Sequence, residues 1–171
     1  MRTRLVKSNE TTHESYISCV GAYQPWQLKH SELIAQLQTV ARANQVGIAV
    51  ILLHPHPAVF LPNNTEQRAK YPPVDEKVAE LIAAGADRVV VCEFDDIDLN
   101  MNAYEFLNEA RKLVRIHSLF MGGRQSLGTG PLGGSESLRD YCRKSGLGLF
   151  FIKTELNKEM ENPNYVHSNA I

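Results

Sequence analysis

The stretch from Ile17 to Pro57 begins ISCVGAYQPWQLKH, ends VILLHPHP, and decides the fold of this chain. An apolar run ends at a glycine, a short loop follows, and a helical pattern leads to a second apolar run. A strand, a glycine turn, a histidine and a helix start in this order are typical of α/β proteins that bind a nucleotide phosphate. We therefore predict a parallel sheet with a ligand site in the loop after its first strand.

The bulk composition indicates one soluble domain. The chain has 171 residues, of which 43% are hydrophobic and 22% are charged, with a formal net charge of −1. This charge offers no general attraction for nucleic acid or an acidic membrane, so we expect neither as a partner. Cys19, Cys92 and Cys142 stand far apart in apolar stretches, which predicts buried free thiols in a reducing compartment. With no apolar leader and no membrane-length segment, the expected location is the cytoplasm.

Strand-like and helical patterns alternate along the chain, which predicts a parallel sheet covered on both faces. Three helix boundaries are predicted from single residues, with Ser31 and Asn102 as N-terminal caps and Gly85 at a C-terminus. A fourth helical pattern starts near 135 and ends at Gly146. The strand-like runs are 16–23, 46–53, 88–94, 116–121 and 147–152.

The expected fold is therefore a Rossmann-like, five-stranded parallel sheet in one domain over residues 16–155. Residues 1–15 are interpreted as a polar N-terminal segment and residues 156–171 as a polar C-terminal tail. Ligands of such folds bind beyond the carboxyl ends of the strands. We thus expect the loops 22–30, 54–64 and 122–134 to face the site.

The first of these loops carries the main phosphate-binding candidates. Lys29 and His30 stand at the predicted helix start, where free backbone amides and the helix dipole favour an anion. A plain connecting loop with one exposed histidine is the alternative. Trp26 would either stack on an aromatic base or be buried as a lid residue. The remaining candidates of this loop are Gly21, Ala22, Tyr23 and Gln27.

The other two loops offer further candidates for the site. His54 and His56 alternate with prolines, which suits either a metal site or, as we favour, a rigid rim of the ligand pocket. The loop from Gly122 holds six glycines and Arg124, which would allow close backbone approach to a phosphate. A mobile surface loop is the alternative there. The aspartates at 95, 96 and 98 suit either Mg²⁺ or a solvated helix start.

The order of these segments resembles the FMN adenylyltransferase (FAD synthetase) domain of bacterial riboflavin kinase/FAD synthetase enzymes. That family has GNFDGVHLGH after its first strand, where this chain has GAYQPWQLKH at 21–30. Its TFDPHP-like signature corresponds to LLHPHP at 52–57, and its helix EK…LL…GVD to EK…LI…GAD from 76 to 87. A PFD…EF segment is similar to EFD…EF from 93 to 106. The family loop VGxDFRFG falls on MGGRQSLG, which ends at Gly128, and the ISSTxIR motif on VHSNAI, which contains Ser168.

The resemblance implies the nucleotidyltransferase fold and the reaction of ATP and FMN to FAD and pyrophosphate. Two motif histidines of the family stabilise charge on the α-phosphate. Here the first is Gln27, the motif glycine is Lys29, and only His30 is retained. The resemblance makes ATP with Mg²⁺, and FMN or FAD, the candidate ligands.

Three functional hypotheses stay open at this point. The favoured one is a degenerate relative that binds a nucleotide or flavin with little or no adenylyl transfer. The second is an active nucleotidyltransferase, and the third is a protein-interaction scaffold without a ligand. A protein partner or a homo-oligomer is compatible with each, and the riboflavin kinase module expected in the family does not follow in this sequence.

Overall fold

The computed structural model describes residues 1–8, 12–23, 28–55, 72–95, 101–122 and 135–152, and these form a six-stranded sheet with four helices. Five strands run parallel, in the order β4-β3-β2-β5-β6, and β1 pairs antiparallel with β4 at the edge. The strands are β1 Arg2–Lys7, β2 Tyr16–Gly21, β3 Gly47–His54, β4 Arg88–Glu93, β5 Ile116–Gly122 and β6 Gly148–Ile152.

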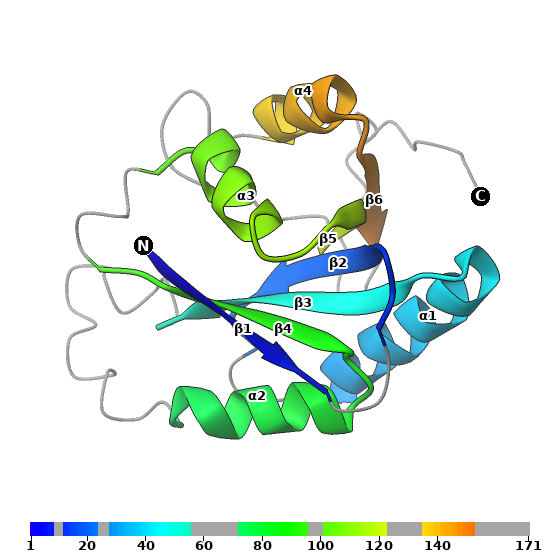
Figure 1. Ribbon diagram of the computed structural model, residues 1–171, viewed down its shortest axis with the longest axis vertical. Coiled ribbons are helices and arrows are strands. Elements are labelled where there is room, and N and C mark those ends of the chain that lie inside the picture. Colours follow the sequence, from blue (N-terminus) through cyan, green and yellow to red (C-terminus); the bar gives the residue numbers. More distant parts are fainter. Residues whose placement is uncertain (9–11, 24–27, 56–71, 96–100, 123–134, 153–171) are drawn as a thin grey trace, which may run out of the picture.

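The helices cover both faces of the sheet (Figure 1). One face carries α1 and α2, and the other carries α3 and α4. None of the described helices is long and apolar enough to cross a membrane. Their bounds are α1 Leu28–Asn44, α2 Val74–Ala83, α3 Ala103–Arg111 and α4 Ser135–Ser145.

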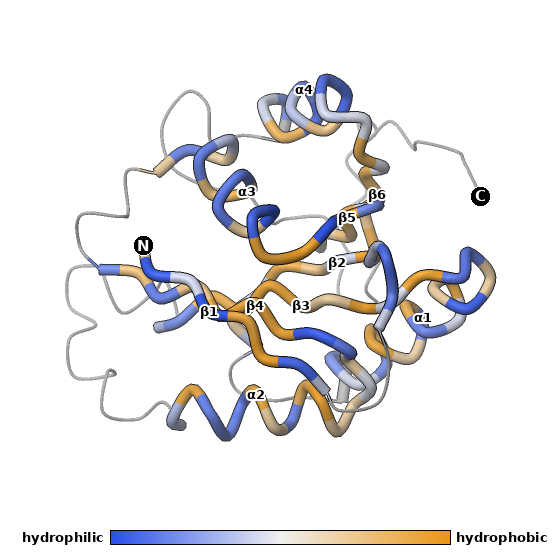
Figure 2. The backbone as a smooth tube through the Cα atoms, in the orientation of Figure 1, coloured by the Kyte–Doolittle hydropathy of each residue, from blue (hydrophilic) through white to orange (hydrophobic). Residues whose placement is uncertain are grey.

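Two apolar cores, one on each face, hold the layers together. On the first face Leu37 of α1 and Leu81 of α2 pack against β-branched residues of the central strands. On the second, Leu107 of α3 and Leu138 of α4 do the same. Figure 2 shows the hydrophobic strands inside and the hydrophilic helix surfaces outside. The predicted α/β fold with helices on both faces is confirmed.

The structure differs from the sequence-based expectation at two places near the N-terminus. The sheet has one strand more than the five predicted, because residues 2–7, taken as part of a polar segment, form β1. Its arginines and lysine alternate with half-buried residues, which is the pattern of an edge strand with one solvated face. The expected cap Ser31 is wrong, because α1 already begins at Leu28. Lys29 and His30 therefore belong to the first turn of α1.

The other helix-boundary predictions are confirmed. Asn102 caps α3 in a capping box, where its side chain accepts from the amide of Glu105 at 3.0 Å and the Glu105 carboxylate accepts from the amide of Asn102 at 3.0 Å. Gly85 follows α2 with φ of +112°, a conformation that favours glycine. Helix α4 ends at Ser145, immediately before Gly146, and the three cysteines are buried free thiols.

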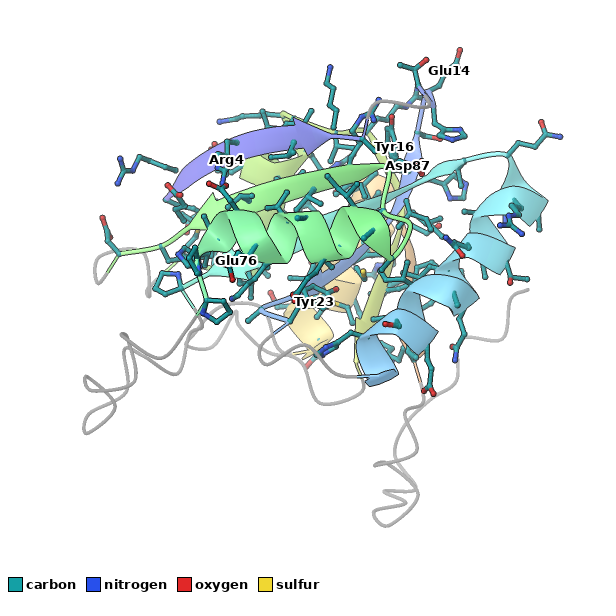
Figure 3. All side chains as sticks on the ribbon, turned by 90° about the horizontal axis from the view of Figure 1, so that it is seen from below. Arg4, Glu14, Tyr16, Tyr23, Glu76 and Asp87 are labelled. Atoms are coloured by element: carbon teal, nitrogen blue, oxygen red, sulfur yellow. The ribbon has the colours of Figure 1, made fainter. Side chains whose placement is uncertain are left out.

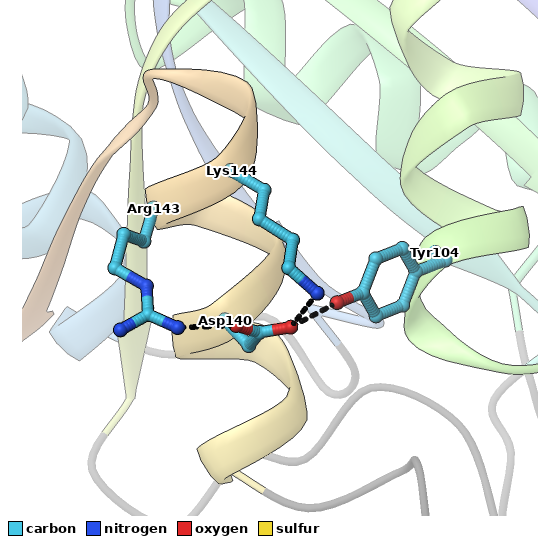
Figure 4. A network of polar contacts seen from close by, with 4 residues as sticks. All are labelled: Tyr104, Asp140, Arg143 and Lys144. Atoms are coloured by element: carbon cyan, nitrogen blue, oxygen red, sulfur yellow. Dashed lines mark hydrogen bonds and ion pairs between the residues drawn. The ribbon is translucent and has the colours of Figure 1, made fainter.

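A polar network joins α3 to α4 on the outside of the second face (Figure 4). The hydroxyl of Tyr104 donates to Asp140 at 2.7 Å, and Lys144 and Arg143 pair with the same carboxylate at 2.7 and 2.6 Å. Hydrogen bonds from Lys144, Tyr104 and Arg143 hold the pKa of Asp140 well below its usual range. The hydrogen bond from Tyr104 to Asp140 thus ties α3 to α4.

Candidate functional site

The strand order places a topological switch point between β2 and β5. The chain passes from β2 to β3 and β4 on one side, then crosses to β5 on the other side of β2. Connections leave in opposite directions at such a point, which opens a crevice beyond the carboxyl ends of the strands. Gly21 and Gly122 end β2 and β5 at this edge, and His54 and Glu93 end β3 and β4. The expected site edge is therefore built around β2.

The turn after β2 is shaped by Tyr23. This residue has φ of +48°, in the left-handed region that few side chains other than glycine and asparagine adopt. Its ring is buried and packs over Gly21, where an added Cβ would lie 3.0 Å from the Tyr23 ring. Its hydroxyl donates to Sγ of Cys19 at 2.9 Å. Because the side chain belongs to the core, a ligand contact of Tyr23 would be made through its backbone.

Tyr23 also packs against His30 in the first turn of α1. The two rings are in edge-to-face contact, with centroids 5.3 Å apart and an interplanar angle of 72°. Figure 3 shows Tyr23 on the side of the sheet that carries α1 and α2. Edge-to-face contacts of this kind fix ring orientation as well as adding stability. The turn thus places the imidazole of His30 beside the N-terminus of a 17-residue helix.

His54 lies at the same edge, at the end of β3. Its backbone carbonyl accepts from the amide of Phe94 at 2.8 Å, while its Nδ1 is buried without a hydrogen-bond partner. Burial lowers the pKa of His54, the charges of Lys77 and Arg4 lower it further, and Glu93 opposes the shift. The lowered pKa favours the neutral form of the ring, and its Nδ1 has no hydrogen-bond partner among the described residues.

Lys77 is the functional candidate that the sequence analysis missed. It belongs to α2 and is 1% exposed, and its Nζ donates to the carbonyl oxygen of Ala22 at 3.4 Å. Burial lowers its pKa to about 8, against a smaller opposing effect of Glu80. A signal was present in the sequence, because a lysine at 77 stands on the apolar stripe of α2 between Val74 and Leu81.

The described part of the site brings together the backbone of 21–23, His30, His54 and Lys77. Lys29 lies in the first turn of α1, and Gly122 is the last residue of β5. The other predicted site residues lie outside the described residues: Trp26, Gln27, His56, Arg124, Gly128 and Ser168.

The chemistry of this edge suits an anion. It combines a helix N-terminus, an imidazole and a buried ammonium, all of which favour a phosphate group. Among the residues that the structure describes, no group of three or more His, Cys, Asp or Glu side chains could hold a metal ion.

Comparisons with known proteins agree with the resemblance found in the motifs. The sequence matches the family described as FAD synthetase over residues 9–162. Two curated relatives, from Bacillus subtilis and Listeria monocytogenes, are each described as a bifunctional riboflavin kinase/FMN adenylyltransferase. The first is 20% identical over 93 residues, which is 54% of this chain and 29% of that protein. The second is 22% identical over 137 residues, 80% of this chain and 44% of that protein.

The chain therefore spans less than half the length of these two relatives. A solved structure described as a macrolide-efflux protein from Streptococcus pneumoniae has a similar fold, with a TM-score of 0.61 and 18% identity. The match covers 89% of this chain and 50% of that one. At this level of identity the likeness supports the α/β fold and carries nothing about activity.

Proposed function

The chain belongs to the FAD synthetase family, and from this premise we propose that it binds a nucleotide or flavin through its phosphate, with little or no adenylyl transfer. The observation that carries the proposal is the β2–α1 turn, where Tyr23 holds the ring of His30 at a helix N-terminus. A phosphate at such a position meets free amides, the helix dipole and an imidazole together.

The proposed weakness of catalysis comes from the residues that replace the family motif. Gln27 stands where the family has its first histidine. A neutral amide cannot provide the positive charge that would stabilise the negative charge on the α-phosphate in the transition state. Losing one such preorganised donor typically lowers the rate by about 10²–10³. Lys29 replaces the glycine at which the family lets the nucleotide approach the backbone, and its side chain needs space that a glycine leaves empty.

We expect ATP, AMP, FMN or FAD to raise the melting temperature of the purified protein. At a ligand concentration about 100 times Kd, binding adds about 2.7 kcal/mol, which corresponds to about 5–10 °C for a chain of this size. Differential scanning fluorimetry measures this shift, and isothermal titration calorimetry gives Kd. Absence of a shift with all four compounds would contradict the proposal and favour an interaction scaffold.

A second assay separates binding from turnover. The protein is incubated with MgATP and FMN, and the FAD formed is quantified by chromatography. The relative from Bacillus subtilis serves as the positive control. We expect binding without FAD above the level of a protein-free blank. Clear FAD formation would instead establish the active nucleotidyltransferase, the second hypothesis from the sequence.

The double substitution Gln27→His, Lys29→Gly is expected to tighten ATP binding by about 10-fold or more. The histidine adds a charge-assisted hydrogen bond, worth about 1.5–3 kcal/mol, and the glycine removes the side chain where the nucleotide approaches the backbone. Glycine in the first turn of α1 costs up to about 1 kcal/mol of stability, so the two single substitutions and a thermal melt are the controls. Unchanged affinity would show that the loss of function is not confined to this loop.

A further inference from the structure

Lys77 carries more hydrogen-bonding capacity than the described residues satisfy. Its ammonium group has three donors, and among the described residues it has one acceptor, the carbonyl of Ala22, at 3.4 Å. That distance is long for an N–H···O hydrogen bond. The residue is nevertheless 1% exposed, and Glu80 of its own helix is the carboxylate whose charge acts on it. A buried cation with so little compensation is expensive to maintain for stability alone.

His54 is a second, independent sign that this part of the site is built for a ligand. Its Nδ1 is buried and has no hydrogen-bond partner in the part of the chain that the structure describes. Lys77 lies close enough for its charge to act on His54, so the two groups are neighbours at the carboxyl edge of the sheet. Unsatisfied buried polar atoms are uncommon in folded proteins, and one beside a buried lysine with a single long hydrogen bond is the expected mark of a missing polar group.

Lys77 lies next to the position proposed for the phosphate. Its amine contacts the backbone of Ala22, one residue after β2 and next to the Tyr23 that orients His30. A lysine carries its charge on a flexible four-carbon stem, so a weak bond to a carbonyl is readily exchanged for a stronger one to an anion. Phosphate oxygens would accept the donors that the carbonyl leaves unfilled.

We propose that Lys77 binds the phosphate group of the ligand beside Ala22 and Tyr23, at the carboxyl end of β2. The inference rests on the proposed function, since it assigns a further residue to the same site. The shared chemistry is a phosphate monoester or anhydride, carried either by an adenine nucleotide or by a flavin mononucleotide. A lysine that served only as a structural clamp on Ala22 would not distinguish ligands with a phosphate from ligands without one.

The test measures the coupling between Lys77 and the phosphate. Dissociation constants of AMP, adenosine, FMN and riboflavin are measured by calorimetry for the wild type and for Lys77→Met, which keeps an unbranched side chain of nearly the same length and removes its charge. Lys112→Met is the matched control, because it changes net charge equally at an exposed lysine paired with Glu109. Thermal melts verify folding, and Lys77→Gln is measured in the same way if the methionine variant does not fold.

We expect Lys77→Met to weaken the binding of AMP or FMN by about 10–100-fold, which corresponds to the free energy of a charge-assisted hydrogen bond. The matching unphosphorylated compound should be unaffected, and Lys112→Met should bind as the wild type does. If only AMP loses affinity, the phosphate that Lys77 binds belongs to a nucleotide. If only FMN loses affinity, it belongs to a flavin. Equal loss for phosphorylated and unphosphorylated compounds, or no loss, would overturn the inference while leaving the proposed function intact. A wild type that binds none of the four compounds would overturn both.

Discussion

Replacing Tyr23 with alanine is expected to lower the free energy of unfolding by about 3–5 kcal/mol, the usual cost of removing a buried aromatic ring. The ring is 6% exposed and packs over Gly21 and against His30. Removing it would leave a cavity between β2 and α1, and the left-handed backbone at 23 would remain. Total stability for a domain is typically about 5–15 kcal/mol, so this single change would remove a large part of it.

The same substitution should weaken ligand binding, because it leaves the imidazole of His30 without the ring that orients it. Urea denaturation with linear extrapolation measures the loss of stability, and calorimetry with AMP and FMN measures the loss of affinity. Tyr23→Phe is the matched control, since it keeps the ring and removes only the hydrogen bond to Cys19, at a cost of about 1 kcal/mol. If alanine and phenylalanine had equal effects, the ring would not have the role that we assign to it.

Raising the pH from 9 to 11 is expected to reduce stability by an amount on the order of 5 kcal/mol. Burial raises the pKa of Cys19 and Cys142 to about 11 and that of Cys92 to about 12, from a usual value of 9.0. Unfolded thiols therefore ionise at a lower pH than folded ones. Their contribution is complete below pH 9 and is lost as the pH rises through the folded values. Burial likewise raises the pKa of Tyr23, which adds to the loss above pH 10.

Lys77 acts in the opposite direction over part of this range. Its folded pKa, about 8, lies below the usual 10.5, so the cost of burying its charge is present below pH 8 and is relieved between pH 8 and 10.5. The steep loss of stability should consequently appear above about pH 10. Urea midpoints at several pH values in the presence of a reductant measure the profile, with a variant in which all three cysteines are alanine as control. If the wild type lost no more stability above pH 10 than the cysteine-free control, the proposed effect of the three buried thiols would be contradicted.

Local signals were sufficient for much of the fold. The apolar strands, the glycine after α2 and the cap at Asn102 each depend on residues within a few positions of one another, and the structure confirms them. The motif order also led to the correct family, because it is a property of the linear chain. Ser31 failed as a cap because a polar residue one turn inside a helix resembles a cap in sequence. Residues 2–7 were missed because an edge strand is polar on its solvated face.

The site itself was predictable only in outline. The β2–α1 loop and His30 follow from the general rule that ligands bind beyond the carboxyl ends of parallel strands. The inward direction of the Tyr23 side chain and the orphan Nδ1 of His54 do not, because both depend on packing between separate elements. Lys77 reaches Ala22 across 55 positions of sequence, and no local pattern encodes such a contact.

The amino-acid sequence by itself thus determined the alternation of strands and helices, the family and the loop that carries the retained histidine, since each is expressed by neighbouring residues. Only the tertiary structure decided that β2 is flanked by β3 and β5, that β1 adds an edge strand antiparallel to β4, and that a buried lysine contacts the backbone after β2. The physical reason is that these features come from contacts between distant segments. Their free energy is gained only when the whole sheet and its covering helices have assembled.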